Sequence, residues 1–144
     1  MILRANGDEC ILPIWIGPFE ADAIQMALEG TQPDRPMTHD LTIRLLASLG
    51  AQVEQVIVNK IVDNTFYAEI TTTLGGQPHV VDARPSDALA LAVRAGVPIY
   101  VARAVVEQCS GPDDDAFWMA RAEKVRQFQA QADLAEEAQQ PSAE

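Results

Sequence analysis

Two short stretches of the sequence repeat one order of chemically useful side chains. DRPMTHDL at residues 34–41 and DARPSDAL at residues 82–89 both run from an acidic residue through Arg and Pro to a hydroxyl residue, Asp and Leu. Proline favours an extended conformation for the preceding arginine, which is Arg35 or Arg84, and a helix is predicted to follow each stretch. A guanidinium beside the free N–H groups of a helix start suits a phosphate. The two stretches therefore predict a two-part anion site.

Acidic side chains and one histidine could add catalytic chemistry to this site. Five carboxylates are candidate oxygen ligands for Mg²⁺ or Mn²⁺: Asp40, Asp82 and Asp87, supported by Glu20 and Asp63. His39 could accept or donate a proton near neutral pH. Residues alone thus indicate an acid and arginine site near two helix starts.

The same residues also allow an interpretation without chemistry. Thr38 and Ser86 can act as N-caps, which a helix start requires for its own sake. Asp40 and Arg44 have the i,i+4 spacing of an ordinary helical ion pair. The arginines and aspartates could equally form a buried ion-pair network that fixes geometry.

Hydrophobic periodicity predicts elements that would position these residues. Asn6-Gly7 between two apolar stretches predicts an N-terminal hairpin, because this pair favours the positive φ angles of a tight turn. Helices are predicted over residues 18–30 and 38–50, and a third from Ser86 to Ala95. Runs rich in Val, Ile and Thr predict a three-stranded antiparallel meander over residues 52–62, 65–74 and 78–82. A final strand at 98–102 and a short helix near Val105 complete an α+β fold with a mixed or antiparallel sheet.

Charge and composition divide the chain into a domain and a tail. The formal net charge of −11 opposes a broad grip on nucleic acid, so a polyanion would need a local site. We predict one α+β domain over residues 1–108 and an acidic linker, a helical tail and a disordered C-terminus over residues 109–144. The tail helix is interpreted as solvated or loosely docked, and packing on a second subunit is the alternative that its aromatic residues Phe117, Trp118 and Phe128 favour.

The sequence also bears on location. Its apolar runs are shorter than the roughly 18 residues that a membrane span requires. Its first residues lack the pattern of a secretory signal, so we expect a cytoplasmic protein without a membrane partner. Cys10 and Cys109 stand apart and predict neither a disulfide framework nor a metal site.

Four stretches resemble motifs of a known family, in the family's order and spacing. They are LPIWIGPFEADAI, RPMTHDL, DNTFYAEI and DARPSDALALAVRAGVPIYV, and together they span Leu12 to about Val101. On these motifs the chain resembles the bifunctional nuclease domain family. The resemblance implies a mixed α+β domain, assembly into homo-oligomers of two or more subunits, and hydrolysis of phosphodiester bonds in DNA or RNA.

The resemblance also implies site residues. The matching polar positions are Glu20, Arg35, His39, Asp40, Asp63, Tyr67, Asp82, Arg84, Ser86, Asp87 and Arg94. As catalytic residues we expect His39, Asp40, Asp82, Arg84 and Asp87, with the three aspartates also binding Mg²⁺ or Mn²⁺. As substrate-binding residues we expect Arg35, Tyr67, Ser86 and Arg94. Two alternatives stay open: a non-catalytic oligomeric module that binds a small anion or a partner protein, and the structural ion-pair network.

Overall fold

The computed structural model describes residues 1–4 and 11–109. Contacts divide the chain into two units, of which the first holds residues 1–3 and 12–110 and the second holds residues 4–11 and 111–144. The helices and the four-stranded sheet described below belong to the first unit. The predicted Asn6-Gly7 turn and the predicted helical tail lie outside the described residues.

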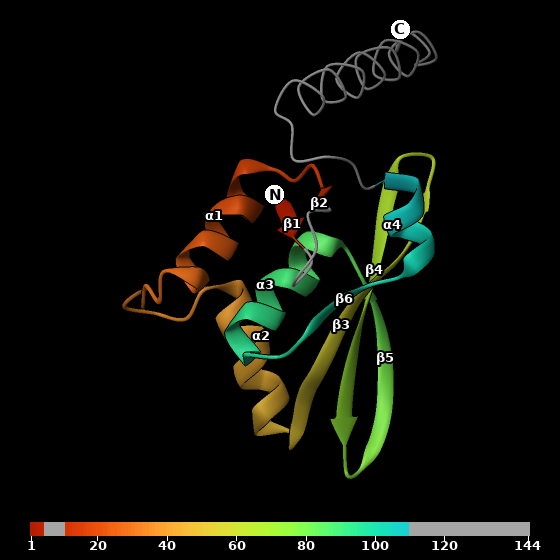
Figure 1. Ribbon diagram of the computed structural model, residues 1–144. Helices are drawn as coiled ribbons and strands as arrows, with labels where there is room; N and C mark the ends of the chain where they lie inside the picture. Colours follow the sequence, from red (N-terminus) through yellow and green to blue (C-terminus); the bar gives the residue numbers. More distant parts are fainter. Residues whose placement is uncertain (5–10, 110–144) are drawn as a thin grey trace, which may run out of the picture. The chain divides into compact units, whose positions relative to one another are not determined.

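A four-stranded mixed sheet spans the first unit (Figure 1). The antiparallel meander is β3 (Ala51–Val62), β4 (Thr65–Leu74) and β5 (Gln77–Ala83), and β6 (Ile99–Val101) pairs parallel to β3. The strand order is β5-β4-β3-β6. The predicted meander and the predicted mixed sheet are therefore confirmed.

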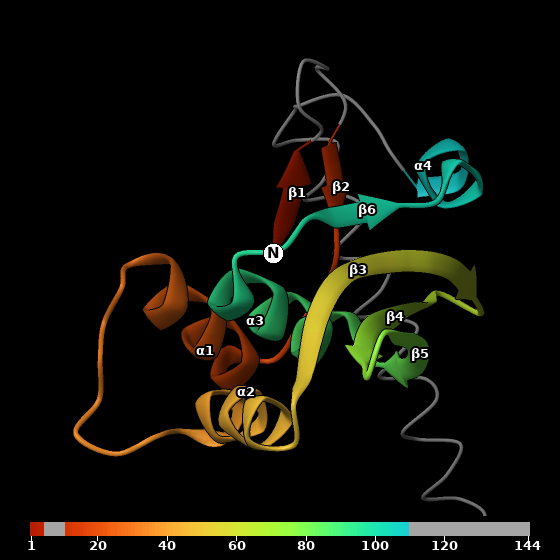
Figure 2. The same ribbon diagram turned by 90° about the horizontal axis from the view of Figure 1, so that it is seen from below.

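The central helix of the fold is α3 (Pro85–Ala95). It packs on β3 and β4, α1 (Pro18–Leu28) packs on α3, and α2 (Thr38–Ser48) packs on both α3 and β3 (Figure 2). Small residues allow this central position, because Ala88, Ala90 and Ala92 are all fully buried. A short side chain lets neighbouring backbones approach closely, and the surrounding apolar residues fill the core at high density. The three helices expected from the sequence are thus confirmed, and α3 is the helix that contacts both α1 and α2 as well as the sheet.

Three short elements complete the described fold. The strands β1 (Ile2–Arg4) and β2 (Ile11–Pro13) pair with each other, as the predicted hairpin requires. The helix α4 (Arg103–Cys109) follows β6 directly and contacts β3. Within the described residues, no helix has the length and apolar character to cross a membrane.

The starts of α2 and α3 differ from the predicted caps. The sequence predicts Thr38 and Ser86 as N-caps, but the structure places Met37 and Arg84 there. Pro85 is the first residue of α3, a position that suits proline because its missing N–H would have no partner in the helix. Each helix therefore begins earlier than the cap pattern indicates.

Candidate functional site

The carboxylates of Asp40 and Asp87 occupy equivalent positions at two helix starts. Each is the third residue of its helix, Asp40 in α2 and Asp87 in α3. One oxygen of Asp40 accepts a hydrogen bond from the backbone N–H of Met37 at 2.9 Å, which caps α2 from inside the helix. The repeated Asp-Leu pattern in the sequence thus corresponds to a repeated structural position, although the arginine precedes the helix directly only in α3.

Asp87 is held between a histidine and an arginine from different segments. Its Oδ2 accepts a hydrogen bond from Arg84 Nε at 2.7 Å, and its Oδ1 lies 3.1 Å from His39 Nε2 on α2. The other side of the Arg84 guanidinium reaches α1, because Nη1 lies 3.4 Å from Glu20 Oε1. We call these four residues, Glu20, Arg84, Asp87 and His39, the polar chain. It links residues from all three helices and the loop before α3.

Charge within the polar chain keeps Asp87 ionised. The hydrogen bond from Arg84 is the main cause that lowers the pKa of the Asp87 carboxyl below its usual value, and His39 acts in the same direction. The same pairing raises the pKa of Arg84 further above its usual value. Arg84 nevertheless leaves 66% of its side chain exposed, whereas His39 leaves 16%. The arginine is therefore the member of the polar chain most open to a ligand.

Arg94 forms a separate connection between the three helices. Its Nε donates to Asp40 Oδ1 at 2.6 Å, and its Nη1 donates to the carbonyl oxygens of Ala23 and Ala90 at 3.0 Å each. The bond from Arg94 is the main cause that lowers the pKa of Asp40. Because only 11% of its side chain is exposed, Arg94 is placed to stabilise helix packing. The i,i+4 ion pair that the spacing of Asp40 and Arg44 allows does not form. The Asp40 carboxylate instead accepts hydrogen bonds from Arg94 and from the Met37 N–H.

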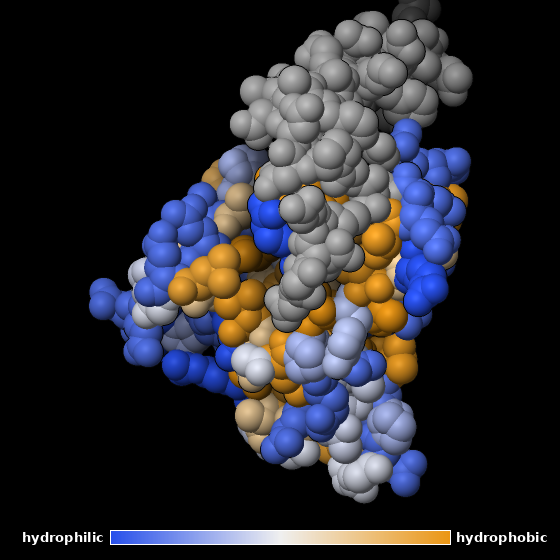
Figure 3. All heavy atoms as spheres, in the orientation of Figure 1, coloured by the Kyte–Doolittle hydropathy of each residue, from blue (hydrophilic) through white to orange (hydrophobic). Residues whose placement is uncertain are grey.

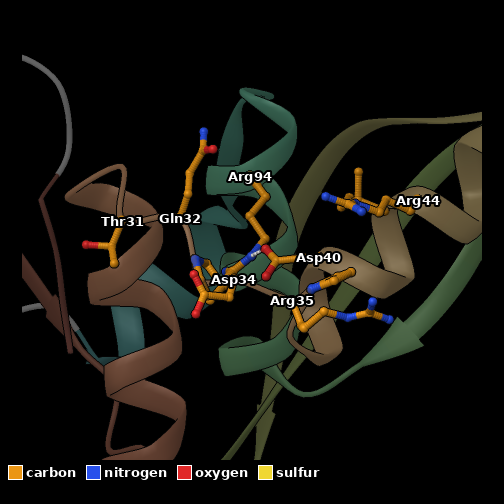
Figure 4. Close-up of a pocket in the computed structure, with 10 residues that line it drawn as sticks. Thr31, Gln32, Asp34, Arg35, Asp40, Arg44 and Arg94 are labelled. Atoms are coloured by element: carbon orange, nitrogen blue, oxygen red, sulfur yellow. Dashed lines mark hydrogen bonds and ion pairs between the residues drawn. The ribbon is translucent and has the colours of Figure 1, made fainter.

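A pocket of about 530 Å³ lies beside the Asp40–Arg94 pair. It is formed by the loop between α1 and α2, by α2 and by α3, as Figure 4 shows for the seven labelled residues. Its lining residues are Thr31, Gln32, Pro33, Asp34, Arg35, Pro36, Asp40, Ile43, Arg44 and Arg94, and we call it the arginine pocket. Arg35 was expected in the site from its Arg-Pro motif. Arg44 also lines the pocket but was not among the expected site residues, because its spacing indicated only a helical ion pair.

Four predicted site residues have other surroundings. Asp82 is exposed on β5, where it pairs in register with Glu69. Asp63 has a φ of 47° in the turn between β3 and β4. The Tyr67 ring lies under the Lys60 ammonium at 4.5 Å. Ser86 is buried in the first turn of α3. No hydrogen bond or ion pair in the described residues joins these four side chains to the polar chain.

The three aspartates predicted to bind a metal are not gathered at one point. Both oxygens of Asp87 and both of Asp40 already contact protein groups, and Asp82 is on β5. Within residues 1–4 and 11–109, no group of three or more His, Cys, Asp or Glu side chains is placed to hold a metal ion. The predicted three-carboxylate arrangement therefore does not fit the described residues.

Sequence comparisons place the chain among known proteins. The model of the bifunctional nuclease domain matches residues 1–114. An uncharacterized protein of Mycobacterium tuberculosis (strain H37Rv) is 41% identical over 89% of this chain and 79% of its own length. Bifunctional nuclease 2 of Oryza sativa subsp. japonica is 30% identical over 73% of this chain but only 34% of its own length. Bifunctional nuclease 1 of Arabidopsis thaliana is 29% identical over 67% of this chain and 30% of its own. Because the domain model covers most of its length, the chain belongs to the bifunctional nuclease domain family.

Proposed function

We propose that this chain is a nuclease that hydrolyses phosphodiester bonds of DNA or RNA at the polar chain. The observation that carries the proposal is the contact between His39 and Asp87, with Arg84 on the other oxygen of the same carboxylate. A histidine beside an ionised carboxylate is suited to proton transfer, and an exposed arginine beside it is suited to a phosphate. The plant relatives named bifunctional nucleases support the same reaction class.

His39 is the proposed general base. With its Nε2–H donated to Asp87, the ring leaves Nδ1 free to take a proton from the attacking water. The Asp87 carboxylate then stabilises the imidazolium that forms, because opposite charges lie 3.1 Å apart. Asp87 thus acts as a positioning residue, since it works through His39.

Arg84 is the proposed ligand of the scissile phosphate. Its contacts with Asp87 and Glu20 use two of the five N–H donors of a guanidinium, and the others can reach a phosphate oxygen. Charge grows on those oxygens in the transition state of hydrolysis, where a fixed cation stabilises it. Glu20 holds the guanidinium from the side of α1 and is a second positioning residue.

Participation of Mg²⁺ or Mn²⁺ stays a prediction. The described residues do not gather three carboxylates, so we assign no step to a cation. Cleavage measured with and without a chelator tests the requirement: loss of cleavage with EDTA and recovery with added Mg²⁺ or Mn²⁺ would confirm it.

The proposed roles are tested with the full chain on single-stranded DNA and RNA. We expect Asp87→Asn and Arg84→Ala to reduce the cleavage rate by roughly 10²-fold or more, because each removes a charge that acts in the transition state. The matched controls are Asp22→Asn on the exposed side of α1 and Arg103→Ala on α4, both outside the polar chain. Cleavage by Asp87→Asn and Arg84→Ala at the rate of their controls would assign any activity elsewhere.

A second candidate is a non-catalytic module that binds a small anion. The arginine pocket favours it, because a concave surface lined by three arginines suits an anionic ligand whether or not a bond is cleaved. Binding without cleavage under every metal condition would support this candidate against the nuclease.

Assembly into homo-oligomers is part of the proposal. Supporting it, three leucines four residues apart are exposed, Leu41 and Leu45 on α2 and Leu49 directly after its end. Light scattering on the full chain measures the mass directly. A single species of 15.6 kDa at all concentrations would contradict assembly.

A further inference from the structure

The arginine pocket holds positive charge that its own residues do not neutralise. Arg94 is paired with Asp40, and Asp34 is the other acidic residue in the lining. Arg35 and Arg44 form no hydrogen bond or ion pair with any residue in the described ranges 1–4 and 11–109. The chain as a whole carries a formal charge of −11. Two arginines of one pocket without an ion-pair partner in the described residues therefore differ in charge from the rest of the chain.

Arg44 does not form the helical ion pair that its spacing allows. An arginine that only supported α2 would pair with the aspartate four residues before it, but that carboxylate is bonded to Arg94 and to the Met37 N–H. Arg44 lines the same pocket as the Asp40–Arg94 pair. Its guanidinium donors therefore remain available to a ligand in the pocket.

The pocket matches a small organic anion in size and lining. A volume of about 530 Å³ falls within the range of small-molecule sites. Pro33, Pro36 and Ile43 supply apolar surface for a flat ring, and Thr31 and Gln32 supply hydrogen-bonding groups. The neighbouring loop between α1 and α2 is hydrophilic in Figure 3. Arg35 and Arg44 are both exposed, so a ligand can reach them from solvent.

We propose that the arginine pocket binds one nucleotide, with Arg35 and Arg44 as hydrogen-bond donors to its phosphate. The proposal rests on the proposed function in one respect, namely that the bound nucleotide is the neighbour of the scissile bond. This placement is supported by the sequence, because Asp40 lines the pocket and directly follows His39 of the polar chain. A free nucleotide and a nucleotide unit within a strand present the same phosphate and base. The experiment therefore has one arm for each.

The first arm measures binding of adenosine 5′-monophosphate and of adenosine to the full chain by calorimetry. We expect Arg35→Ala and Arg44→Ala each to weaken binding of the monophosphate about tenfold or more, because each removes a charged donor to the phosphate. Arg103→Ala, an exposed arginine on α4, should leave the affinity unchanged. Equal affinities for the three variants, or equal binding of adenosine and its monophosphate, would overturn the proposal.

The second arm measures cleavage kinetics on a short single-stranded oligonucleotide. We expect Arg44→Ala to raise KM about tenfold with little change in kcat, whereas His39→Ala lowers kcat. An unchanged KM for Arg44→Ala would overturn the placement of the nucleotide beside the scissile bond. If no protein cleaves but the monophosphate still binds through Arg44, the pocket stands and the nuclease proposal fails. Circular dichroism confirms that each variant is folded.

Discussion

At the scale of single residues, Asp87 and Asp40 share one structural position but have different partners. Asp87 joins a histidine and an arginine that is largely exposed, whereas Asp40 joins an arginine that is largely buried. An exposed cation can exchange its partners for a ligand, but a buried one is fixed by its contacts. We therefore propose the polar chain as the reactive half of the two helix starts and the Asp40–Arg94 pair as the structural half.

The lowered pKa of Asp87 predicts a dependence of stability on acid. Because the pKa is lower in the folded state, ionised Asp87 stabilises the fold above its usual value of 3.8, and this contribution is lost as pH falls below it. In Asp87→Asn the contribution is absent at every pH. Urea unfolding between about pH 5 and pH 2 should therefore show a smaller loss of unfolding free energy for the variant. If acid lowers the unfolding free energy of Asp87→Asn as much as that of the unchanged protein and of the control Asp22→Asn, the pairing of Asp87 with Arg84 and His39 is refuted.

Removal of Arg94 should destabilise the protein strongly. Arg94→Ala removes the donor to Asp40 Oδ1 and to the Ala23 carbonyl, and we expect the free energy of unfolding to fall by about 3 kcal/mol. Arg94→Lys should recover only part of it, because an ammonium lacks the planar fork of a guanidinium. Urea denaturation measures the free energy of unfolding of each variant, with Arg103→Ala as the control. A change within about 0.5 kcal/mol, as for an ordinary surface residue, would contradict the structural role.

At the scale of elements, local patterns predicted the helices and the meander, but pairings between distant segments had no local signal. The helix α2 is visible from its leucine spacing, and β3 to β5 are visible from their Val, Ile and Thr content. The parallel pairing of β6 with β3 joins residues about 40 positions apart and depends on tertiary packing. Helix starts were misplaced by one or two residues, because a proline or an internal carboxylate can replace a capping side chain.

The turn between β3 and β4 gives a prediction at this scale. Asp63 and Asn64 both have positive φ, at 47° and 60°, which two-residue hairpin turns require. The turn alone therefore explains the presence of Asp63, without a role in the candidate site. Asp63→Asn should keep both the stability and the cleavage rate, since asparagine tolerates this conformation well. A large loss of cleavage with unchanged thermal unfolding would instead place Asp63 in the site.

At the scale of the whole molecule, the sequence predicted the family, and it predicted only part of the way in which the candidate site residues are grouped. His39, Asp87, Arg84 and Glu20 were all expected, and they are in contact. Asp82, Asp63 and Tyr67 were expected in the same site, but their interactions in the described residues are with other groups, because a motif records residue types and not the strand or turn that carries them. Arg44 was missed because its spacing has a common local explanation.

The central claim is that His39, held by Asp87, is the general base of a nuclease. The chain offers a matched control in His79, an exposed histidine on β5 outside the polar chain. The direct measurement is the rate of single-stranded DNA and RNA cleavage by the full chain carrying His39→Ala or His79→Ala. We predict that His39→Ala lowers the rate by about 10²- to 10⁴-fold while His79→Ala leaves it unchanged. Equal rates for the two variants would contradict the claim.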